Sequence, residues 1–485
     1  MAGEIRLIGR MVDMDFSSLK RTGIFVNAAE HAKDAELWRQ GIGLGGASHE
    51  PLPPKVVNGL RLLRPRLIRI FLQEYFNIYP DHGVFDWSRL DPYMESLAQT
   101  GAKVLATVNI KPPVLFPNLG QEHWQPNDVG EYQDVIRALV KRYSLDRRIV
   151  THWEHLNEPN LGEDGGCPFL IPGAQENYDF YRMLAKTVLE VFPEAKVGGP
   201  AVSHYDCPML EEFIRLCHEN GTPLQFVSWH SYKDDPASLR AQTEHVRHMI
   251  RNMGASQPEL MINEMNKGFD YQDAGHPSYH LVSVEEQAYQ GKRAAFLASA
   301  VMEMTGAGLD WSHYFSAWDC RMRPLEFSRF YSPHGITEVM YRHWNESPHR
   351  YGLFSDSGRV RPQYFVYRLL AQMDGSMLHC KADSGIAAIA AGSGRRTAVL
   401  MSNYALDACP DRIALLQFEG LTPGLKKLNV YRIDDMCRWD EETLTLLPVE
   451  TRRVDVLERF ACQCLLPANS VASVILEDAE ESMSC

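Results

Sequence analysis

Two glutamates stand beside asparagines at the ends of two strand-like runs, and their type and spacing suit acid–base and nucleophilic chemistry. The first run ends in Leu156–Asn160, which contains Glu158, and the second ends in Ile262–Asn266, which contains Glu264. Two carboxyl groups that face each other across a pocket can cleave a glycosidic bond. One attacks the anomeric carbon, and the other protonates the departing oxygen and then deprotonates water. We therefore predict that Glu158 and Glu264 form such a pair.

Both runs fit a barrel of parallel strands. Short β-rich runs alternate with helix-sized amphipathic segments, and this rhythm indicates parallel strands joined by helices. The eight candidate strands are 41–46, 67–71, 104–110, 149–156, 195–199, 225–230, 259–263 and 309–315. Eight strand–helix units within about 300 residues favour a closed α/β fold, the (β/α)8 TIM barrel. Strand ends meet at one face of such a barrel, so Glu158 and Glu264 would lie across its mouth.

The connecting segments carry helical periodicity. The clearest case starts at Asp91, which could cap a helix that ends before Gly101. Further helices are expected at 177–191, 209–220, 237–253, 285–305 and 361–373.

The pattern changes after residue 374, where short alternating runs separated by turn residues predict an all-β domain. We therefore expect a (β/α)8 barrel over residues 36–374, followed by a C-terminal β-sandwich over 375–485. The first 35 residues contain a strand-like run, Glu4–Gly9. We expect this N-terminal segment to join the sandwich.

Composition and charge exclude several classes of protein. The 485 residues include 62 Asp and Glu but only 49 Lys and Arg, for a net charge of −13. Such an acidic chain is a poor candidate for binding nucleic acid or an anionic membrane. Its apolar runs fall short of the roughly 20 residues that span a bilayer. The start does not resemble a signal peptide, and the ten scattered cysteines suit free thiols, so we expect a cytoplasmic protein.

The segments around the two glutamates resemble the clan A glycoside hydrolases, most of all glycoside hydrolase family 39. The supporting segments are His152–Leu161, Val197–Ala201, Phe226–Tyr232, Tyr351–Phe354 and Arg361–Tyr364. The resemblance covers most of residues 60–375, and a sandwich that follows the barrel is usual in such enzymes. It implies a retaining glycosidase that works by double displacement and needs no cofactor.

The resemblance also implies a role for each site residue. Glu158 would be the acid/base and Glu264 the nucleophile, and Asn157 would hold the 2-hydroxyl of the sugar. His230 and Tyr232 would support the two carboxyl groups.

Chemistry points to the same pair of roles. The resemblance implies that Arg69 pairs with Glu264, and a nearby arginine supplies the low pKa that a nucleophile needs. An acid such as Glu158 needs a raised pKa, which burial and a second deep carboxylate, Glu154, would supply. The two carboxyl groups should lie about 5–5.5 Å apart for retention, and a gap of 7 Å or more would indicate inversion.

Other residues near the strand ends are candidates for substrate contact. Trp318 is placed where its indole could form the floor under a sugar ring. Lys267 and Arg321, with Lys111, Lys233 and Arg323, lie just past strand ends and could recognise an acidic sugar. The alternative is that these cations are solvated loop charges, neutralised by nearby aspartates. The segments Phe71–Phe76 and Trp318–Arg323 depart from the xylosidase pattern, so the mechanism transfers better than the substrate.

Two other functional classes stay open. A catalytically silent barrel would bind carbohydrate without cleaving it, and a metal-dependent hydrolase would need convergent His or Asp ligands. The strand ends offer no metal-ligand spacing, so no metal is predicted. We expect a small carbohydrate substrate and leave its sugar, anomer and linkage open, with β-xylosides and α-L-iduronides among the candidates. A long insertion at 320–350 could build a contact between subunits of a homo-oligomer.

Overall fold

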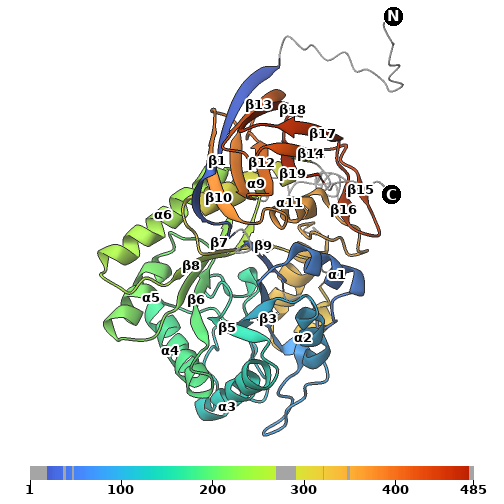
Figure 1. The fold of residues 1–485 in the computed structure, drawn as a ribbon. Helices are drawn as coiled ribbons and strands as arrows, with labels where there is room; N and C mark the ends of the chain where they lie inside the picture. Colours follow the sequence, from blue (N-terminus) through green and yellow to red (C-terminus); the bar gives the residue numbers. More distant parts are fainter. Residues whose placement is uncertain are drawn as a thin grey trace, which may run out of the picture.

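The barrel of the computed structural model consists of eight parallel strands in sequence order (Figure 1). The model describes residues 19–36, 40–45, 48–268, 291–319, 322–346 and 350–479. The barrel strands are β2 (Gln40–Gly43), β3 (Leu67–Leu72), β4 (Lys103–Val108), β5 (Val150–His155), β6 (Lys196–Val202), β7 (Phe226–Tyr232), β8 (Glu259–Asn266) and β9 (Trp311–Phe315). β2 pairs with both β3 and β9, and this pairing closes the barrel. The prediction of a (β/α)8 barrel is therefore confirmed.

Helices cover the outside of the barrel (Figure 1). The main ones are α1 (Pro54–Leu63), α2 (Leu90–Ala98), α3 (Val129–Val140), α4 (Ala174–Val191), α5 (Pro208–Glu219), α6 (Pro236–Asn252), α9 (Gly291–Gly306) and α11 (Pro362–Leu370). Shorter helical elements are η3 (Glu74–Phe76), η4 (Lys141–Asp146), η5 (Gly162–Gly165), α10 (Pro324–Phe327) and η6 (Gly335–Glu346). Because helices shield each strand on its outer side, a strand such as β3 is buried at every position.

Asp91 does not cap α2 as predicted, because the helix begins two residues earlier, at Leu90, and Arg89 occupies the capping position. The Asp91 carboxylate instead accepts hydrogen bonds from Arg142 and Arg147, and from the hydroxyl of Tyr143. These partners lie more than 50 residues further along the chain, so the local capping pattern gave no sign of them. Asp91 therefore ties α2 to η4.

The C-terminal β-domain is one continuous sheet of nine strands. Its strands are β1 (Lys20–Asp34), β10 (Ser376–Ala382), β11 (Ala387–Ser393), β12 (Arg396–Asn403), β13 (Arg412–Glu419), β14 (Gly424–Ile433), β17 (Glu450–Val456), β18 (Arg459–Leu466) and β19 (Ser470–Asp478). Their order is β17-β14-β19-β12-β11-β10-β1-β13-β18, and a separate ribbon pairs β15 (Trp439–Asp440) with β16 (Thr445–Leu446). Apolar side chains from both halves of the sheet share one core, so it forms a sandwich.

The N-terminal strand belongs to this β-domain. β1 lies between β10, with which it is antiparallel, and β13, with which it is parallel. From β1, the described chain passes through the barrel and then returns to the β-domain. The predicted strand Glu4–Gly9 lies outside the described residues.

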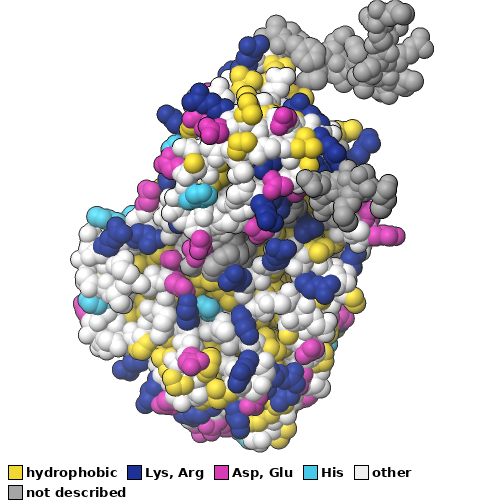
Figure 2. All heavy atoms as spheres, viewed as in Figure 1, with side chains coloured by type: hydrophobic (Ala, Val, Ile, Leu, Met, Phe, Trp, Pro, Cys, Tyr) yellow, Lys and Arg dark blue, Asp and Glu magenta, His cyan; other side chains and the backbone are white. Residues whose placement is uncertain are grey.

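The β-domain packs on the barrel through α9 and α11 (Figure 1). Leu400, Val471 and Ile475 join the hydrophobic core of the barrel, and the hydroxyl of Ser402 donates to the carbonyl of Ala295 on α9 at 2.7 Å. Acidic and basic side chains are interspersed over both domains on the face seen in Figure 2. Among the helices of the described residues, none has the length and apolar character needed to cross a bilayer.

Candidate active site

Glu158 sits on a sharp turn after β5. Leu156 and Glu158 both adopt left-handed backbone conformations, with φ of 56° and 44°. Such conformations are uncommon for residues with a side chain, and they cluster at functional sites. The backbone N–H of Glu158 donates to the carbonyl of Ala201 on β6 at 2.9 Å and fixes the turn to the neighbouring strand.

Arg69, in the middle of β3, joins three site residues. Its Nε donates to Glu154 at 2.7 Å, its Nη1 to Glu264 at 2.8 Å and its Nη2 to the Oδ1 of Asn157 at 2.7 Å. The guanidinium is only 1% exposed. Burial opposes its charge, but Glu154 and Glu264 outweigh this effect and raise the pKa of Arg69. The predicted pairing of Arg69 with Glu264 is present in the structure.

Glu154 anchors the arginine and is itself saturated with donors. Besides Arg69, it accepts hydrogen bonds from the hydroxyls of Thr107 and Ser228 at 2.7 Å and from the amide of Asn263 at 2.5 Å. It is fully buried. We expected Glu154 to raise the pKa of Glu158, but the charge of Glu154 is committed to Arg69.

Glu264, on β8, accepts a hydrogen bond on each carboxyl oxygen. Oε1 accepts from Arg69, and Oε2 accepts from the hydroxyl of Tyr232 at 2.8 Å. Only 6% of the residue is exposed. Because both oxygens act as acceptors and one faces a cation, the arrangement suits the ionised carboxylate that a nucleophile requires.

Glu158 has the opposite electrostatic setting. Burial raises the pKa of Glu158 to about 8, although Arg69 and His204 partly oppose this shift. Its Oε1 lies 2.7 Å from the Nδ1 of His230. Burial lowers the pKa of His230 to about 4, so its imidazole is neutral near pH 7. A carboxyl group with a raised pKa beside one that faces a cation is the arrangement that an acid and a nucleophile need.

His230 also limits the distance between the two carboxyl groups. Its Nδ1 lies 2.7 Å from Oε1 of Glu158 and 3.4 Å from Oε2 of Glu264. Because these distances of 2.7 Å and 3.4 Å share one atom, the two oxygens lie at most about 6.1 Å apart. Two groups this close can act on the same glycosidic bond.

Trp318 lies just beyond the last barrel strand, and its role as the floor under a sugar ring stays a prediction. β9 ends at Phe315, and Trp318 follows in a loop, where it pairs with Phe354 in an isolated bridge. Its indole is partly buried against the barrel core. The segment beyond it is held by the buried ion pair of Asp319 with Arg361, at 2.6 Å.

The predicted cations do not form a free positive cluster within the described residues. Lys267 pairs with Asp234 at 2.6 Å, and Arg323 pairs with Glu50. Lys111 is fully buried and donates to the backbone carbonyls of Gly120 and Pro168. Arg321 lies outside the described residues. Lys267 pairs with one of the aspartates that the sequence places nearby. Contact of Lys267 or Arg321 with substrate stays a prediction.

Sequence reasoning missed several residues that position the pair. Thr107, Ser228 and Asn263 bind Glu154 from three different strands. Gly165 is a further case, because a Cβ at this position would lie 2.4 Å from Oε2 of Glu158. Its carbonyl also accepts from the amide of Asn157 at 2.8 Å. The polar type of Thr107, Ser228 and Asn263 within otherwise apolar strands was the available signal, whereas nothing local marked Gly165.

Comparison with known proteins places these features in context. The model of the glycosyl hydrolases family 39 matches residues 37–438. A β-xylosidase of Geobacillus stearothermophilus is 26% identical over 215 residues, which are 40% of this chain and 39% of that protein. A β-xylosidase of Caldicellulosiruptor saccharolyticus is 23% identical over 322 residues, or 62% of this chain and 56% of that protein. The matched regions thus span less than two thirds of these relatives.

Among solved structures, a family 39 enzyme from Xanthomonas axonopodis pv. citri superposes with a TM-score of 0.74. The superposition covers 97% of this chain and all of that one, at 17% sequence identity. A likeness at this identity supports the fold, including the β-domain packed on the barrel.

Proposed function

We propose that this chain, which belongs to the glycosyl hydrolases family 39, is a retaining glycosidase that cleaves small glycosides. The observation that carries the proposal is the pair of carboxyl groups bridged by His230: burial raises the pKa of Glu158, whereas Glu264 accepts hydrogen bonds from Arg69 and Tyr232.

In the first step, a carboxylate oxygen of Glu264 attacks the anomeric carbon, and the bond from this carbon to the leaving oxygen breaks. Glu158 gives its proton to that oxygen, and a glycosyl ester of Glu264 forms. In the second step, Glu158 takes a proton from water, whose oxygen attacks the same carbon. The ester bond breaks, and its electron pair returns to Glu264.

The positive charge of Arg69 stays neutralised through this cycle because the guanidinium has two carboxylate partners. When Glu264 becomes an ester it loses its charge, but Glu154 still neutralises the buried guanidinium at 2.7 Å. A buried cation left without any partner would cost several kcal/mol. We infer that Glu154 stabilises the covalent intermediate by keeping the buried guanidinium paired.

The short gap between the carboxyl groups supports retention over inversion. Retaining glycosidases hold the two groups about 5–5.5 Å apart, whereas inverting enzymes separate them by about 6.5–9.5 Å to admit water. The limit of about 6.1 Å applies to one oxygen of each group, Oε1 of Glu158 and Oε2 of Glu264, and it agrees with the closer spacing of retaining enzymes.

A neutral pentoside, in particular a β-xyloside, is the first candidate substrate. Both curated relatives above are β-xylosidases. Lys267, one of the cations considered for an acidic sugar, is paired with Asp234 at 2.6 Å.

A panel of aryl glycosides tests this proposal. It should contain β-xyloside, β-glucoside, β-galactoside, α-arabinoside and uronides, and NMR should identify the anomer released first. We expect turnover of the β-xyloside with the β-anomer of xylose as first product. First release of the α-anomer would refute retention, and binding without turnover of any glycoside would favour a silent carbohydrate-binding barrel.

The pH dependence of kcat/KM should show a basic limb set by Glu158. A general acid must be protonated, so activity is present below its pKa and falls as pH rises through about 8. Profiles from pH 5 to 9.5 on a substrate with a poor leaving group would check this. In Glu158→Ala, an activated aryl leaving group that needs no proton should react without that limb, and a limb that survived would assign it to another group.

Tyr232→Phe should lower kcat/KM by about 10- to 100-fold, because it removes a buried hydrogen bond to the charged nucleophile. Steady-state kinetics would measure this loss. Tyr364→Phe is the matched control, because its buried hydroxyl donates to the carbonyl of Gly59 within α1, and its loss should leave kinetics unchanged. Equal activity of Tyr232→Phe and the native protein would remove Tyr232 from the site.

A further inference from the structure

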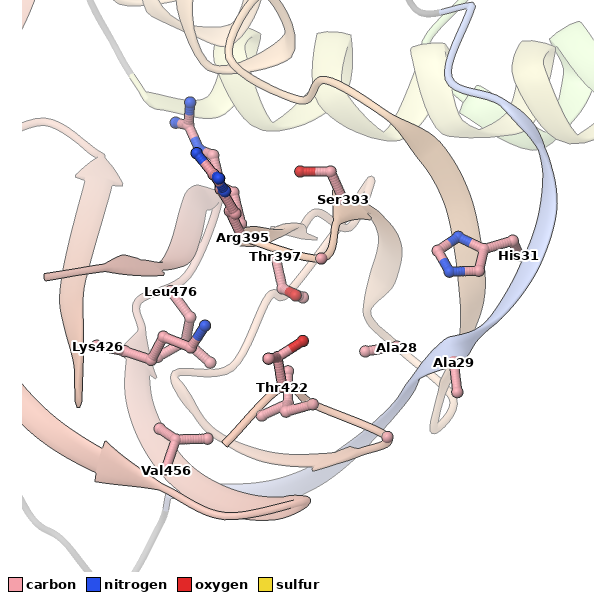
Figure 3. A pocket seen from close by; sticks show the side chains of 14 residues that line it. Ala28, Ala29, His31, Ser393, Arg395, Thr397, Thr422, Lys426, Val456 and Leu476 are labelled. Atoms are coloured by element: carbon pink, nitrogen blue, oxygen red, sulfur yellow. The ribbon is translucent and has the colours of Figure 1, made fainter. Parts of the chain in front are cut away.

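A cavity separate from the candidate active site lies in the β-domain, and all of its lining residues belong to that domain (Figure 3). It is enclosed by the end of β1, the turn between β11 and β12, the turn between β13 and β14, and parts of β17 and β19. Its volume is about 180 Å³. A water molecule takes about 30 Å³ of liquid volume, so the space suits one small ligand rather than a polymer.

The charged groups of this cavity are all basic. Arg395, Arg396 and Lys426 line it, and the lining contains no aspartate or glutamate. This is unexpected in a chain whose net charge is −13. A concave site lined by one sign of charge concentrates ions of the opposite sign.

Lys426 is built into the wall of the cavity. Its residue is only 5% exposed, and its ammonium pairs with Asp478, whose side chain is half exposed and lies outside the lining. An ammonium has three donors, and within the described residues only Asp478 engages one. Burying a charge costs free energy unless its donors are satisfied, so the remaining donors favour an acceptor inside the cavity.

Two hydroxyl groups extend the donor set. The hydroxyls of Thr397, on β12, and Thr422, in the β13–β14 turn, point toward each other inside the cavity (Figure 3). Neither hydroxyl hydrogen-bonds to another residue in the part of the chain that the structure describes. The guanidinium group of Arg395 rises along one side of the cavity and would add charge at its rim (Figure 3).

We propose that this cavity binds an oxyanion, with the ammonium of Lys426 and the hydroxyls of Thr397 and Thr422 as its donors. The shared chemistry is a compact group of negatively charged oxygens, found in phosphate and in the carboxylate of an acidic sugar. The site is separate from the barrel mouth and does not depend on the glycosidase proposal.

Isothermal titration calorimetry of the full chain, with inorganic phosphate and with glucuronate as probes, tests this inference. Chloride at equal ionic strength corrects for nonspecific screening. We expect one saturable site and weakening of about tenfold or more in Lys426→Met, because a charge-assisted hydrogen bond is lost. Lys427→Met is the matched control, since the adjacent Lys427 is exposed on the opposite face of β14 and lies outside the lining.

Thr422→Val keeps the test decisive if Lys426→Met fails to fold, because Thr422 is exposed in a turn and its replacement removes only the hydroxyl donor. It should weaken binding several-fold. Tighter phosphate binding would assign the site to phosphate groups, and tighter glucuronate binding would assign it to acidic sugars. Absence of a saturable site for both probes, or equal loss in Lys426→Met and Lys427→Met, would overturn the proposal.

Discussion

Glu264→Ala is expected to lower kcat on an aryl glycoside by about 10⁴-fold or more, because no other described group can form the covalent intermediate at that position. The substitution leaves Arg69 bonded to Glu154 and Asn157, so the fold should survive. Azide fits the space that the carboxylate vacates and should restore turnover. Because azide would attack from the side of Glu264, opposite the leaving group, the glycosyl azide should have inverted configuration.

Glu259→Ala provides a control on the same strand. Glu259 begins β8 at the opposite end of the barrel and pairs with Lys196 at 2.7 Å. Its replacement should leave kcat nearly unchanged and show no rescue by azide. If Glu264→Ala retained native activity, or if azide gave a product of retained configuration, Glu264 would not be the nucleophile.

Arg69→Met is expected to lower the free energy of unfolding by about 3–5 kcal/mol, because it leaves two buried carboxylates without their cation. Urea denaturation followed by fluorescence would measure the change. Activity should fall as well, since the nucleophile loses its partner. Arg69→Lys keeps the charge but cannot make three bonds in one plane. Its free energy of unfolding should therefore lie between that of Arg69→Met and that of the native protein.

Arg182→Met is the matched exposed substitution. Arg182 lies on α4, its side chain is 60% exposed, and its ion pair with Asp179 is local to the helix. Surface pairs of this kind contribute at most about 1 kcal/mol. If Arg69→Met unfolded at the same urea concentration as Arg182→Met, the three-way contact of Arg69 would contribute nothing to stability.

The electrostatic division between the two glutamates comes from burial and from contacts distant in sequence. Glu158 and Glu264 have similar sequence neighbours, each following an asparagine near a strand end. Only the structure shows that Glu264 faces Arg69 and Tyr232, whereas Glu158 faces a neutral imidazole. From sequence alone, their roles came from the family resemblance.

The local sequence pattern predicted the positions of residues correctly where the barrel geometry fixes them, namely at the ends of its strands. Parallel strands must end at one face, so the polar residues after β5 and β8 could be placed together without knowledge of any contact. The family resemblance added Asn157, His230 and Tyr232 to the site. The alternation of strand-like and helical runs likewise identified the eight barrel strands, because each must bury both of its faces.

Tertiary structure decided which partner each charged or aromatic group takes. Arg69 could have been an ordinary core arginine until the fold brought Glu154, Asn157 and Glu264 within its reach. Lys267 could have been a free cation until it met Asp234. Trp318 lies in a loop beyond β9, where its bridge to Phe354 joins it to a segment further along the chain. The period of the sequence determines strands and faces, whereas side-chain pairing depends on distances between residues far apart in the chain, which only the folded molecule sets.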